Sequence, residues 1–225
     1  MEVDSTPAQR PQRTTLAGRI VSLVPLDAET HADALFQQVR GPENELLWAY
    51  LWDGPFHEAE SFCADLRLKS QSEDPLFFCI LDNHSQRAVG YASFLRIEPR
   101  HRVIEVGNIL FTPLLQKTAG ATEAMYLMAR HVFEGLGYRR YEWKCNALNA
   151  PSRSAALRLG FSFEGIFRQH MIIKGRNRDT AWFAMLDSEW PARKAAFERW
   201  LDPANFDVQG RQKLSLSDLN AMLQS

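Results

Sequence analysis

The segment Leu114–Phe133, "LLQKTAGATEAMYLMARHVF", combines an apolar helical pattern with a start made of small residues. It follows a strand-like run that ends at Pro113, and the small residues occupy positions 118–121. Short side chains at a helix start let another molecule approach the backbone, where unpaired N–H groups and the helix dipole favour an anion. The segment therefore predicts an anion-binding helix start. The alternative is an ordinary start whose small residues pack on a sheet.

Composition narrows the class of protein. The chain has 225 residues, of which 45% are hydrophobic and 24% charged, as in ordinary globular proteins. A net charge of −1 gives no basic field for nucleic acid or an anionic membrane. No apolar run approaches the ~20 residues of a membrane span, and the N-terminal residues lack the apolar core of a secretory signal. We expect a cytoplasmic protein without nucleic-acid or membrane partners.

The chain contains three cysteines, Cys63, Cys79 and Cys145. They are widely spaced in apolar surroundings, which favours reduced core thiols over a catalytic nucleophile. Neither a C-x-x-C pair nor histidines at ligand spacing occur, so no metal site is predicted.

Apolar spacing and turn residues predict the order of elements. After a disordered segment over residues 1–15, we expect a domain over 16–190 and a C-terminal helix with a polar tail over 191–225. The predicted strands are 19–27, 75–82, 88–99, 102–113, 138–147, 161–175 and 179–190. The predicted helices are 27–40, 57–72, 120–136, 150–160 and 191–201. This order favours an α+β domain, with a mixed sheet and helices on both faces.

Two motifs resemble those of the GNAT superfamily of acyl-CoA N-acyltransferases. The family signature Q/R-x-x-G-x-G/A falls on residues 116–121, with Ala119 in place of the first glycine. The block "ALNAPSRSAALRLGFSFEG" over 147–165 resembles N-x-x-S…A-x-x-x-G-F-x-x-E-G, most closely that of the Rim-type ribosomal-protein N-acetyltransferases. The resemblance covers roughly residues 18–190. It implies a largely antiparallel sheet of about seven strands.

The resemblance also implies a site for acetyl-CoA, with its pyrophosphate on the helix start and its pantetheine arm beside a strand that splays from its neighbour. A backbone N–H on that strand would polarise the thioester carbonyl. The implied contacts are Asn108, Ile109, Leu110, Phe111, Gln116, Lys117, Thr118, Ala119, Gly120, Ala121, Thr122 and Asn149, with Ser152 near the sulfur. Alanine at position 119 is compatible with the motif if its φ angle is negative.

The implied reaction is direct attack of an amine on the thioester, which requires a base and a proton for the departing thiolate. Glu105 is the leading base because an apolar strand raises the pKa of a carboxyl group, although it can equally be solvent-facing. In "FRQHMIIKG" (167–175) the branch's catalytic carboxylate is absent, which leaves Glu105, His170 or bulk water as the base. Ser152 would donate to the thiolate; alternatively, Asn149 and Ser152 form a plain helix cap.

The loop residues Trp48, Tyr50 and Trp52 would contact the amine acceptor, or else fill the core. Nearby, Asp53 and Glu45 would attract a cationic acceptor, or else simply solvate the surface. Residues 175–178 are predicted to form a solvated hairpin tip, and Asp179 is predicted to be structural. A stripe of Ala195, Phe197 and Leu201 would pack on the domain or on a second subunit, as in a homodimer.

We therefore expect an acetyl-CoA-dependent N-acetyltransferase that forms a ternary complex with a small-molecule amine or a protein N-terminus. The alternatives are a catalytically inactive acyl-CoA-binding or regulatory module and a transferase of longer acyl groups. Bulk at Leu110 and Phe111 argues against the longer acyl groups.

Overall fold

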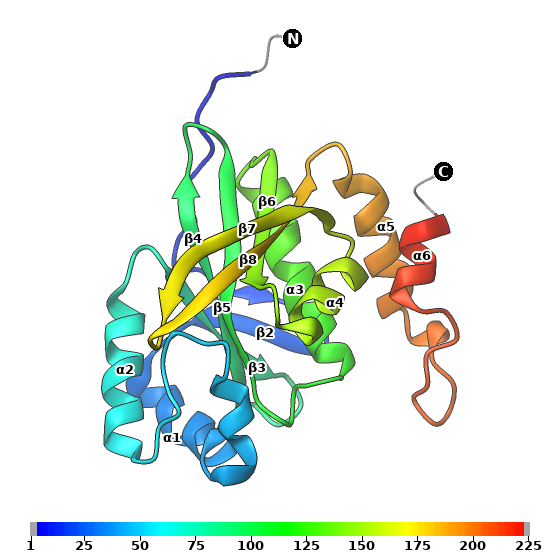
Figure 1. The fold of residues 1–225 in the computed structure, drawn as a ribbon. Helices are drawn as coiled ribbons and strands as arrows, with labels where there is room; N and C mark the ends of the chain where they lie inside the picture. The colour runs from blue at the N-terminus through cyan, green and yellow to red at the C-terminus, as the bar shows by residue number, and fades with distance from the viewer. Residues whose placement is uncertain (1–3, 223–225) are drawn as a thin grey trace.

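The computed structural model describes residues 4–222, which form one eight-stranded sheet with helices on both faces (Figure 1). The strand order is β1-β2-β3-β4-β5-β6-β8-β7. Strands β5 and β6 run parallel, and the other neighbouring pairs run antiparallel. The expected seven strands become eight because a two-residue strand precedes the first one. The strands are β1 Leu16–Ala17, β2 Val21–Pro25, β3 Leu76–Asp82, β4 Ala88–Glu98, β5 Val103–Phe111, β6 Arg140–Asn146, β7 Ser162–Ile173 and β8 Arg176–Leu186.

The helices form two layers with separate apolar clusters. One layer holds α1 (Ala28–Val39), the 3-10 helix η1 (Pro42–Trp48) and α2 (Ala59–Gln71). The other is built around α3 (Ala119–Arg130), which continues as a π-helical turn over His131–Gly135. That second cluster also includes residues of α4 (Ala150–Arg158), α5 (Trp190–Leu201) and α6 (Leu216–Met222); a short 3-10 helix, Pro203–Asn205, lies between α5 and α6.

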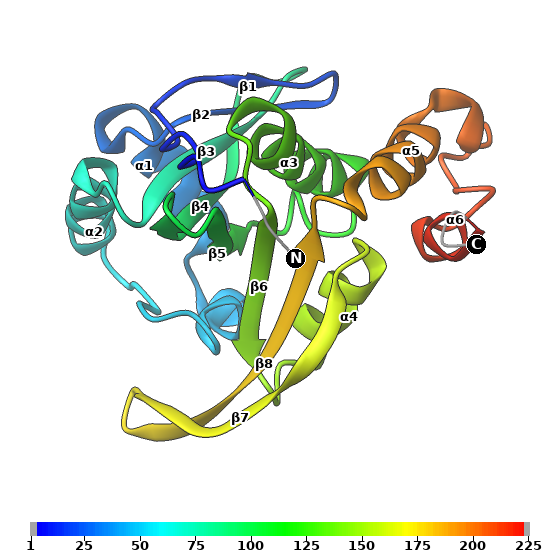
Figure 2. The ribbon, with the colours of Figure 1, turned by 90° about the horizontal axis from the view of Figure 1, so that it is seen from above.

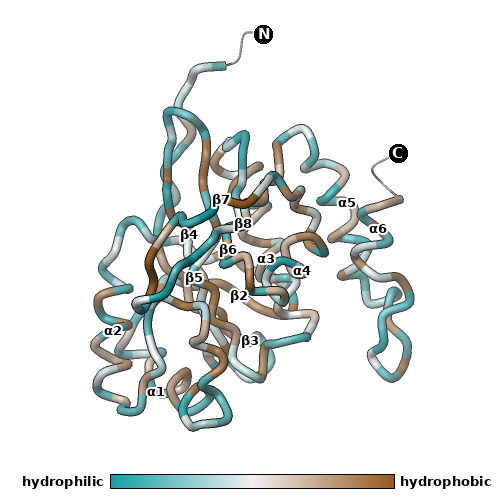
Figure 3. Tube along the Cα trace, viewed as in Figure 1, coloured by the Kyte–Doolittle hydropathy of each residue, from teal (hydrophilic) through white to brown (hydrophobic). Residues whose placement is uncertain are grey.

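Strand β3 illustrates how the sheet separates the two clusters. Phe77 and Cys79 belong to the α1–α2 side, whereas Phe78 and Ile80 belong to the α3 side. Successive side chains of a strand point to opposite faces, so a strand covered on both sides reads as a continuous apolar run. Figure 3 shows this apolar colour along the central strands and more polar colour on β8.

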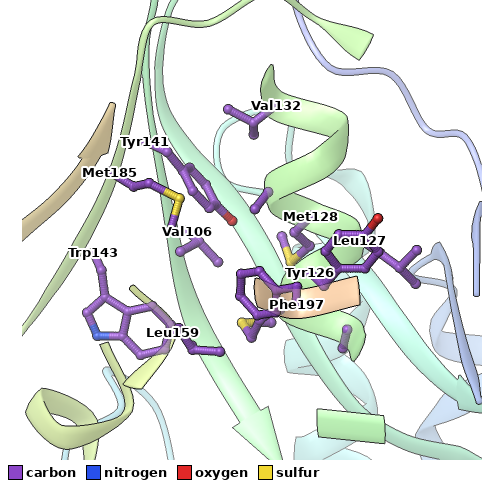
Figure 4. Close-up of a cluster of buried hydrophobic side chains, with 14 of the residues drawn as sticks. Val106, Tyr126, Leu127, Met128, Val132, Tyr141, Trp143, Leu159, Met185 and Phe197 are labelled. Atoms are coloured by element: carbon purple, nitrogen blue, oxygen red, sulfur yellow. The ribbon is translucent and has the colours of Figure 1, made fainter. Parts of the chain in front are cut away.

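The C-terminal helix α5 packs on its own domain. Phe197 is buried beside Val106, Tyr141 and Met185 of the sheet, as the close-up in Figure 4 shows. Its ring centroid lies 5.5 Å from that of Tyr126 in α3. Of the predicted stripe, Phe197 and Leu201 are buried in this cluster and Ala195 is exposed. The homodimer stays a prediction.

Both ends of the chain differ from the expectation. Instead of disorder over residues 4–15, Ala8 N donates to Pro99 O (3.0 Å) and Gln9 N to Leu136 O (3.1 Å). In the expected polar tail, α6 buries Leu216 and Leu219 completely. Residues 1–3 and 223–225, on which the same predictions fall, lie outside the described residues.

Glu123 of α3 fixes the helix to the start of the sheet. Its buried carboxylate accepts the backbone N–H groups of Arg19 (3.0 Å), Ile20 (2.6 Å) and Val21 (2.8 Å). Charge-assisted hydrogen bonds to buried donors are among the stronger ones, because the donors have no water to replace them. This contact therefore sets where α3 begins relative to β2.

We predict that Glu123→Ala lowers the free energy of unfolding by about 3 kcal/mol, since it leaves three backbone N–H groups unpaired near the core. Urea unfolding measures the change. Glu73→Ala, at an exposed glutamate, is the matched control and is expected to cost less than about 0.5 kcal/mol. Equal stability of the two variants would contradict the anchoring role.

Candidate functional site

The pairing of β5 with β6 stops halfway along both strands. Their parallel ladder runs from Val103↔Arg140 to Val106↔Trp143. Beyond it, β5 continues to Phe111 on β4, and β6 continues to Asn146 on β8. Figure 2 shows β6, β8 and β7 running away from the block of β1 to β4. The edge of β5 after Val106 is therefore free to pair with an extended ligand.

A bulge at Gly107 and Asn108 shapes this free edge. Asn108 has a φ of +50°, and the register of β4 with β5 shifts beside it. Ser93 fixes the bulge: its Oγ donates to Gly107 O (3.1 Å) and accepts Asn108 Nδ2 (3.0 Å). The Leu110 side chain is buried in the α1–α2 cluster, so only its backbone is available to a ligand. That residues 108–111 flank the pantetheine arm stays a prediction.

Helix α3 begins close to the end of β5 with two free donors. Its N-cap is Thr118, whose Oγ1 accepts Ala121 N (3.3 Å) and whose N–H donates to Leu115 O (3.3 Å). The N–H groups of Ala119 and Gly120 have no acceptor within residues 4–222. Ala119 is the first helical residue, where φ is negative, so alanine fits the motif position. These two N–H groups at the positive helix end can bind an anion.

The remaining motif residues have other partners. A Cβ on Gly120 would lie 2.9 Å from Val21 Cγ1, so close packing on β2 requires glycine there. Thr122 is buried, its Oγ1 accepts Arg158 Nη2 (2.7 Å), and its position is the first with an intrahelical N–H bond. Gln116 Nε2 donates to Phe111 O (3.0 Å), whereas Lys117 is exposed. Contrary to the prediction, the N–H of Thr122 is not an available donor.

A charged cluster, formed by Arg96, Glu105, Glu142 and Lys144, lies on the sheet close to the point where β5 and β6 separate. Glu105 Oε2 contacts Lys144 Nζ (2.8 Å) and Arg96 Nε (3.2 Å), and Lys144 Nζ also contacts Glu142 Oε2 (2.6 Å). The Lys144 Nζ atom lies 3.9 Å from the centroid of the Trp182 ring. Burial raises the pKa of Glu105, and the nearby Lys144 opposes this shift. The carboxyl group therefore binds a proton more readily than an exposed glutamate does.

The second oxygen of Glu105 is not engaged by the two cations. Both cations contact Oε2, and no hydrogen bond to Oε1 occurs within residues 4–222. Gly107 places no side chain against this oxygen, since a Cβ there would lie 3.7 Å from Oε1. The arrangement suits a carboxylate that receives a proton through Oε1.

His170 faces the same cations from β7. Its Nδ1 lies 3.0 Å from Thr180 Oγ1, and the ring is half-buried against Phe167, with centroids 5.6 Å apart. The register shift of β7 between Phe167 and Met171 turns it towards β8. Burial lowers the pKa of His170, and the charges of Arg96, Arg178 and Lys144 lower it further. His170 is therefore mostly neutral at pH 7 and can accept a proton.

Helix α4 starts just after the end of β6, with Ser152 in its first turn. Asn149 Oδ1 accepts Ser152 N (3.1 Å), so the helix-cap interpretation of Asn149 is confirmed. Ser152 Oγ accepts Trp143 Nε1 (3.0 Å). This bond orients the serine hydroxyl. Ser152 also interacts with Cys145: burial raises the pKa of that thiol, and a hydrogen bond from Ser152 opposes the shift.

The aromatic residues of the predicted acceptor site separate into two groups. Trp48 is only 1% exposed and packs on Phe56 and Phe62, at ring distances of 5.2 and 6.2 Å. It is a core residue, so its assignment to the acceptor site is wrong. Tyr50 and Trp52 are 41% and 47% exposed. Tyr50 reaches across to the loop before α4, where its hydroxyl donates to Leu148 O (3.1 Å).

The β7–β8 hairpin closes over this aromatic loop through two contacts that the sequence does not predict. Lys174 Nζ donates to the carbonyl oxygens of Trp48 (3.1 Å), Asp53 (2.9 Å) and Gly54 (2.8 Å). Arg178 is 8% exposed, with its guanidinium 5.7 Å from the Trp52 ring centroid. The solvated-tip interpretation is therefore wrong for Arg178. Period-two alternation with Thr180 and Trp182 was the available signal.

The acidic residues named from the sequence have separate roles. Asp53 pairs with Lys69 (2.7 Å), while Glu45 is exposed. Asp179 Oδ1 accepts Gln169 N (2.7 Å), as expected of a structural residue. Residues 4–222 contain no group of three or more His, Cys, Asp or Glu side chains able to hold a metal ion. Within the same residues, every helix is too short or too polar to cross a membrane.

The family profile "Acetyltransferase (GNAT) domain" matches residues 21–162, well over half of the chain. The chain belongs to this acetyltransferase family. It is an acetyl-CoA-dependent enzyme that transfers an acetyl group to an amine.

Individual relatives agree with this assignment. A GCN5-related N-acetyltransferase from Brucella melitensis has 47% identity and a TM-score of 0.95, over 97% of this chain and 99% of that one. The ribosomal-protein-serine acetyltransferase of Escherichia coli (strain K12) is 30% identical over 72% of this chain and 91% of that protein. The microcin C7 self-immunity acetyltransferase MccE, solved with acetyl-CoA and AMP, shares the fold: TM-score 0.64, 18% identity, 75% of this chain and 93% of that one.

We predict that Ala119→Pro weakens coenzyme A binding about 10-fold, because proline removes one N–H that faces the anion. Proline is tolerated at the first helical position, and Thr118, at φ −98° and ψ 165°, has the extended backbone that precedes proline. Calorimetric titration with coenzyme A measures the affinity. Ala119→Ser keeps the N–H and serves as control; equal affinities in both variants would exclude this helix start as the phosphate site.

Proposed function

We propose that this protein N-acetylates a small amine by direct attack on acetyl-CoA within a ternary complex. The observation that carries the proposal is the arrangement of three features along β5: its free edge, the two free N–H groups of α3 at one end and the charged cluster at the other. The edge would bind an extended arm, the N–H groups would bind its anionic end, and Glu105 of the cluster would accept a proton. Nothing in the comparisons supports the inactive acyl-CoA-binding module.

In the proposed binding mode, the N–H groups of Ala119 and Gly120 hold the pyrophosphate of acetyl-CoA. The pantetheine arm then runs along residues 108–111 as an added strand, on the edge that β6 leaves unpaired. This brings the thioester to the point where β5 and β6 separate. A backbone N–H of the β5 edge polarises its carbonyl there.

Glu105 is the proposed base. Its Oε1 takes the proton of the attacking amine, directly or through a water molecule, while Oε2 stays fixed by Lys144 and Arg96. Because its pKa is raised, the carboxylate is a better proton acceptor than an exposed one. The neutral His170 is the second candidate, since it faces two cations of the same cluster.

Ser152 is the proposed hydrogen-bond donor to the leaving thiolate. Trp143 donates to its oxygen, so the hydroxyl hydrogen points elsewhere, and it can turn from the Cys145 thiol to the thiolate of coenzyme A. A serine hydroxyl that donates a hydrogen bond to a forming thiolate stabilises the charge without itself forming a covalent intermediate.

The acceptor is proposed to be a small molecule that contacts Tyr50 and Trp52. The name of the Escherichia coli relative keeps a protein N-terminus as the second candidate. Lys174, in the turn between β7 and β8, bonds to the 49–58 loop, and Arg178 of β8 lies against Trp52 of that loop. This closure favours a compact acceptor. Cytoplasmic location remains part of the proposal.

We predict that Glu105→Gln lowers kcat by about 10²-fold and removes the loss of rate at low pH, since a base must be unprotonated to act. Thiol release from acetyl-CoA, measured against a panel of amines, gives the rates. Glu142→Gln removes the other carboxylate that contacts Lys144 and is the matched control, expected to change kcat less than about 5-fold.

Two further variants separate the remaining roles. If His170→Gln, rather than Glu105→Gln, removes the low-pH loss of rate, His170 is the base. Ser152→Ala is expected to lower kcat with little change in the KM for acetyl-CoA. Rates in Glu105→Gln and Ser152→Ala equal to the wild type would refute the proposed chemistry.

A further inference from the structure

Arg178 of β8 is a buried cation without a carboxylate partner. The residue is 8% exposed, yet no Asp or Glu oxygen lies within ion-pair distance of it among the described residues. By contrast, the ammonium groups of two lysines with buried side chains have carboxylate partners: Lys69 pairs with Asp53 and Asp65, and Lys144 pairs with Glu105 and Glu142. Burying an unpaired charge is costly, and burial accordingly lowers the pKa of Arg178. A buried charge without a protein partner can be neutralised by an anionic group that arrives with the substrate.

The guanidinium group of Arg178 is oriented but only partly used. Its Nε donates to Thr180 Oγ1 (3.1 Å). The two terminal nitrogens have no hydrogen-bond acceptor in residues 4–222. Neither of them is among the fully buried unpaired nitrogens, unlike Nη1 of Arg13, so they reach solvent. Two parallel N–H donors at the end of a fixed side chain match the two oxygens of a carboxylate or phosphate.

Positively charged side chains from several strands surround Arg178. Arg96 on β4 and Lys144 on β6 flank Glu105 on β5, and these two cations together with Arg178 all lower the pKa of His170. Among the residues that the structure describes, Glu105 is the only carboxylate with a resolved effect on Arg178 itself, and it already has two cations in contact. Two carboxylates, Glu105 and Glu142, contact Arg96 and Lys144, so adding Arg178 leaves one positive charge in excess. An incoming anion would balance it.

The position of Arg178 joins this charge to the proposed acceptor site. Its guanidinium lies against Trp52, which is half exposed on the 49–58 loop. Through Thr180 Oγ1 it shares an oxygen with the His170 ring. An anion on the terminal nitrogens would thus sit beside the aromatic contact and the proton-accepting groups.

We propose that Arg178 binds an acidic group of the acceptor, so that the acceptor class is a small amine that also carries a carboxylate or a phosphate. This inference rests on the proposed function, because it names the substrate class of the same site. The guanidinium fork holds the acid group while the amine faces the thioester. The acid group thereby orients the nucleophile and neutralises the unpaired charge.

The test uses matched pairs of amines that differ only in the acid group. One arm compares amino acids with their carboxamides, and the other compares aminoalkyl phosphates with the parent amino alcohols. Thiol release from acetyl-CoA gives kcat/KM for the wild type, Arg178→Gln and Arg178→Lys. The control is Arg176→Gln, at an exposed arginine two residues earlier on β8.

We expect the wild type to prefer the acid-bearing member of at least one arm by about 10-fold or more. Arg178→Gln should remove that preference by lowering kcat/KM for the acid-bearing amine, with the neutral amine and the KM for acetyl-CoA unchanged. Arg178→Lys should restore part of it, because it keeps the charge and loses the fork. The arm that responds identifies the carboxylate or the phosphate.

An acid preference that survives in Arg178→Gln would overturn the inference, as would equal losses on both members of a pair. If no amine is acetylated, the proposed function fails instead. A binding measurement then tests the role of Arg178. N-acetyl amino acids and N-acetylaminoalkyl phosphates are titrated calorimetrically into the protein in the presence of coenzyme A, and the affinities of the wild type and Arg178→Gln are compared. Equal affinities in both proteins would reject the anion site. Thermal unfolding of each variant checks that it is folded.

Discussion

The structure depends on one interrupted interaction, the parallel pairing of β5 with β6. A parallel ladder satisfies backbone groups on both strands, and here it ends after Val106↔Trp143 although both strands continue. Each strand keeps its outer partner, so the sheet survives the separation. The inner edge of β5 is left with backbone groups that water or a ligand must satisfy. The bulge lies on β5 just after the separation, and α3 and α4 are the helices that follow β5 and β6 in the chain.

The charged cluster beside the separation is hard to explain by stability alone. Removing Glu105, Glu142 and Lys144 from water costs more than their mutual attraction typically returns, and apolar residues of similar size would serve the fold as well. Trp182 beneath the ammonium of Lys144 offsets part of that cost. The cluster therefore makes more sense as a device that holds one carboxylate in a fixed position with a raised pKa.

Local pattern predicted most of the fold, since apolar spacing located most of the strands and helices to within a few residues. It failed where a distant segment decides whether a residue is exposed. Residue type alone leaves Trp48 between the acceptor site and the core, and it assigns Arg178 to solvent. In the structure the 49–58 loop folds under the β7–β8 hairpin, so that the tryptophan fills the core and the arginine lies beneath Trp52. Period-two alternation places Arg178 on the same face as Thr180 and Trp182, but no local signal encodes its contact with Trp52, more than 100 residues away.

The phosphate-loop motif shows a different limit, because two physical requirements select the same residue. Packing against Val21 excludes a side chain at Gly120, and an approaching anion would exclude one as well. The sequence therefore leaves the two interpretations open. The structure shows that they are compatible: packing removes the side chain on the sheet side, while the N–H of the same residue remains unpaired at the helix start. The anchoring of α3 by Glu123 couples them, since it holds the helix close enough to β2 to require glycine and so fixes where its free N–H groups lie.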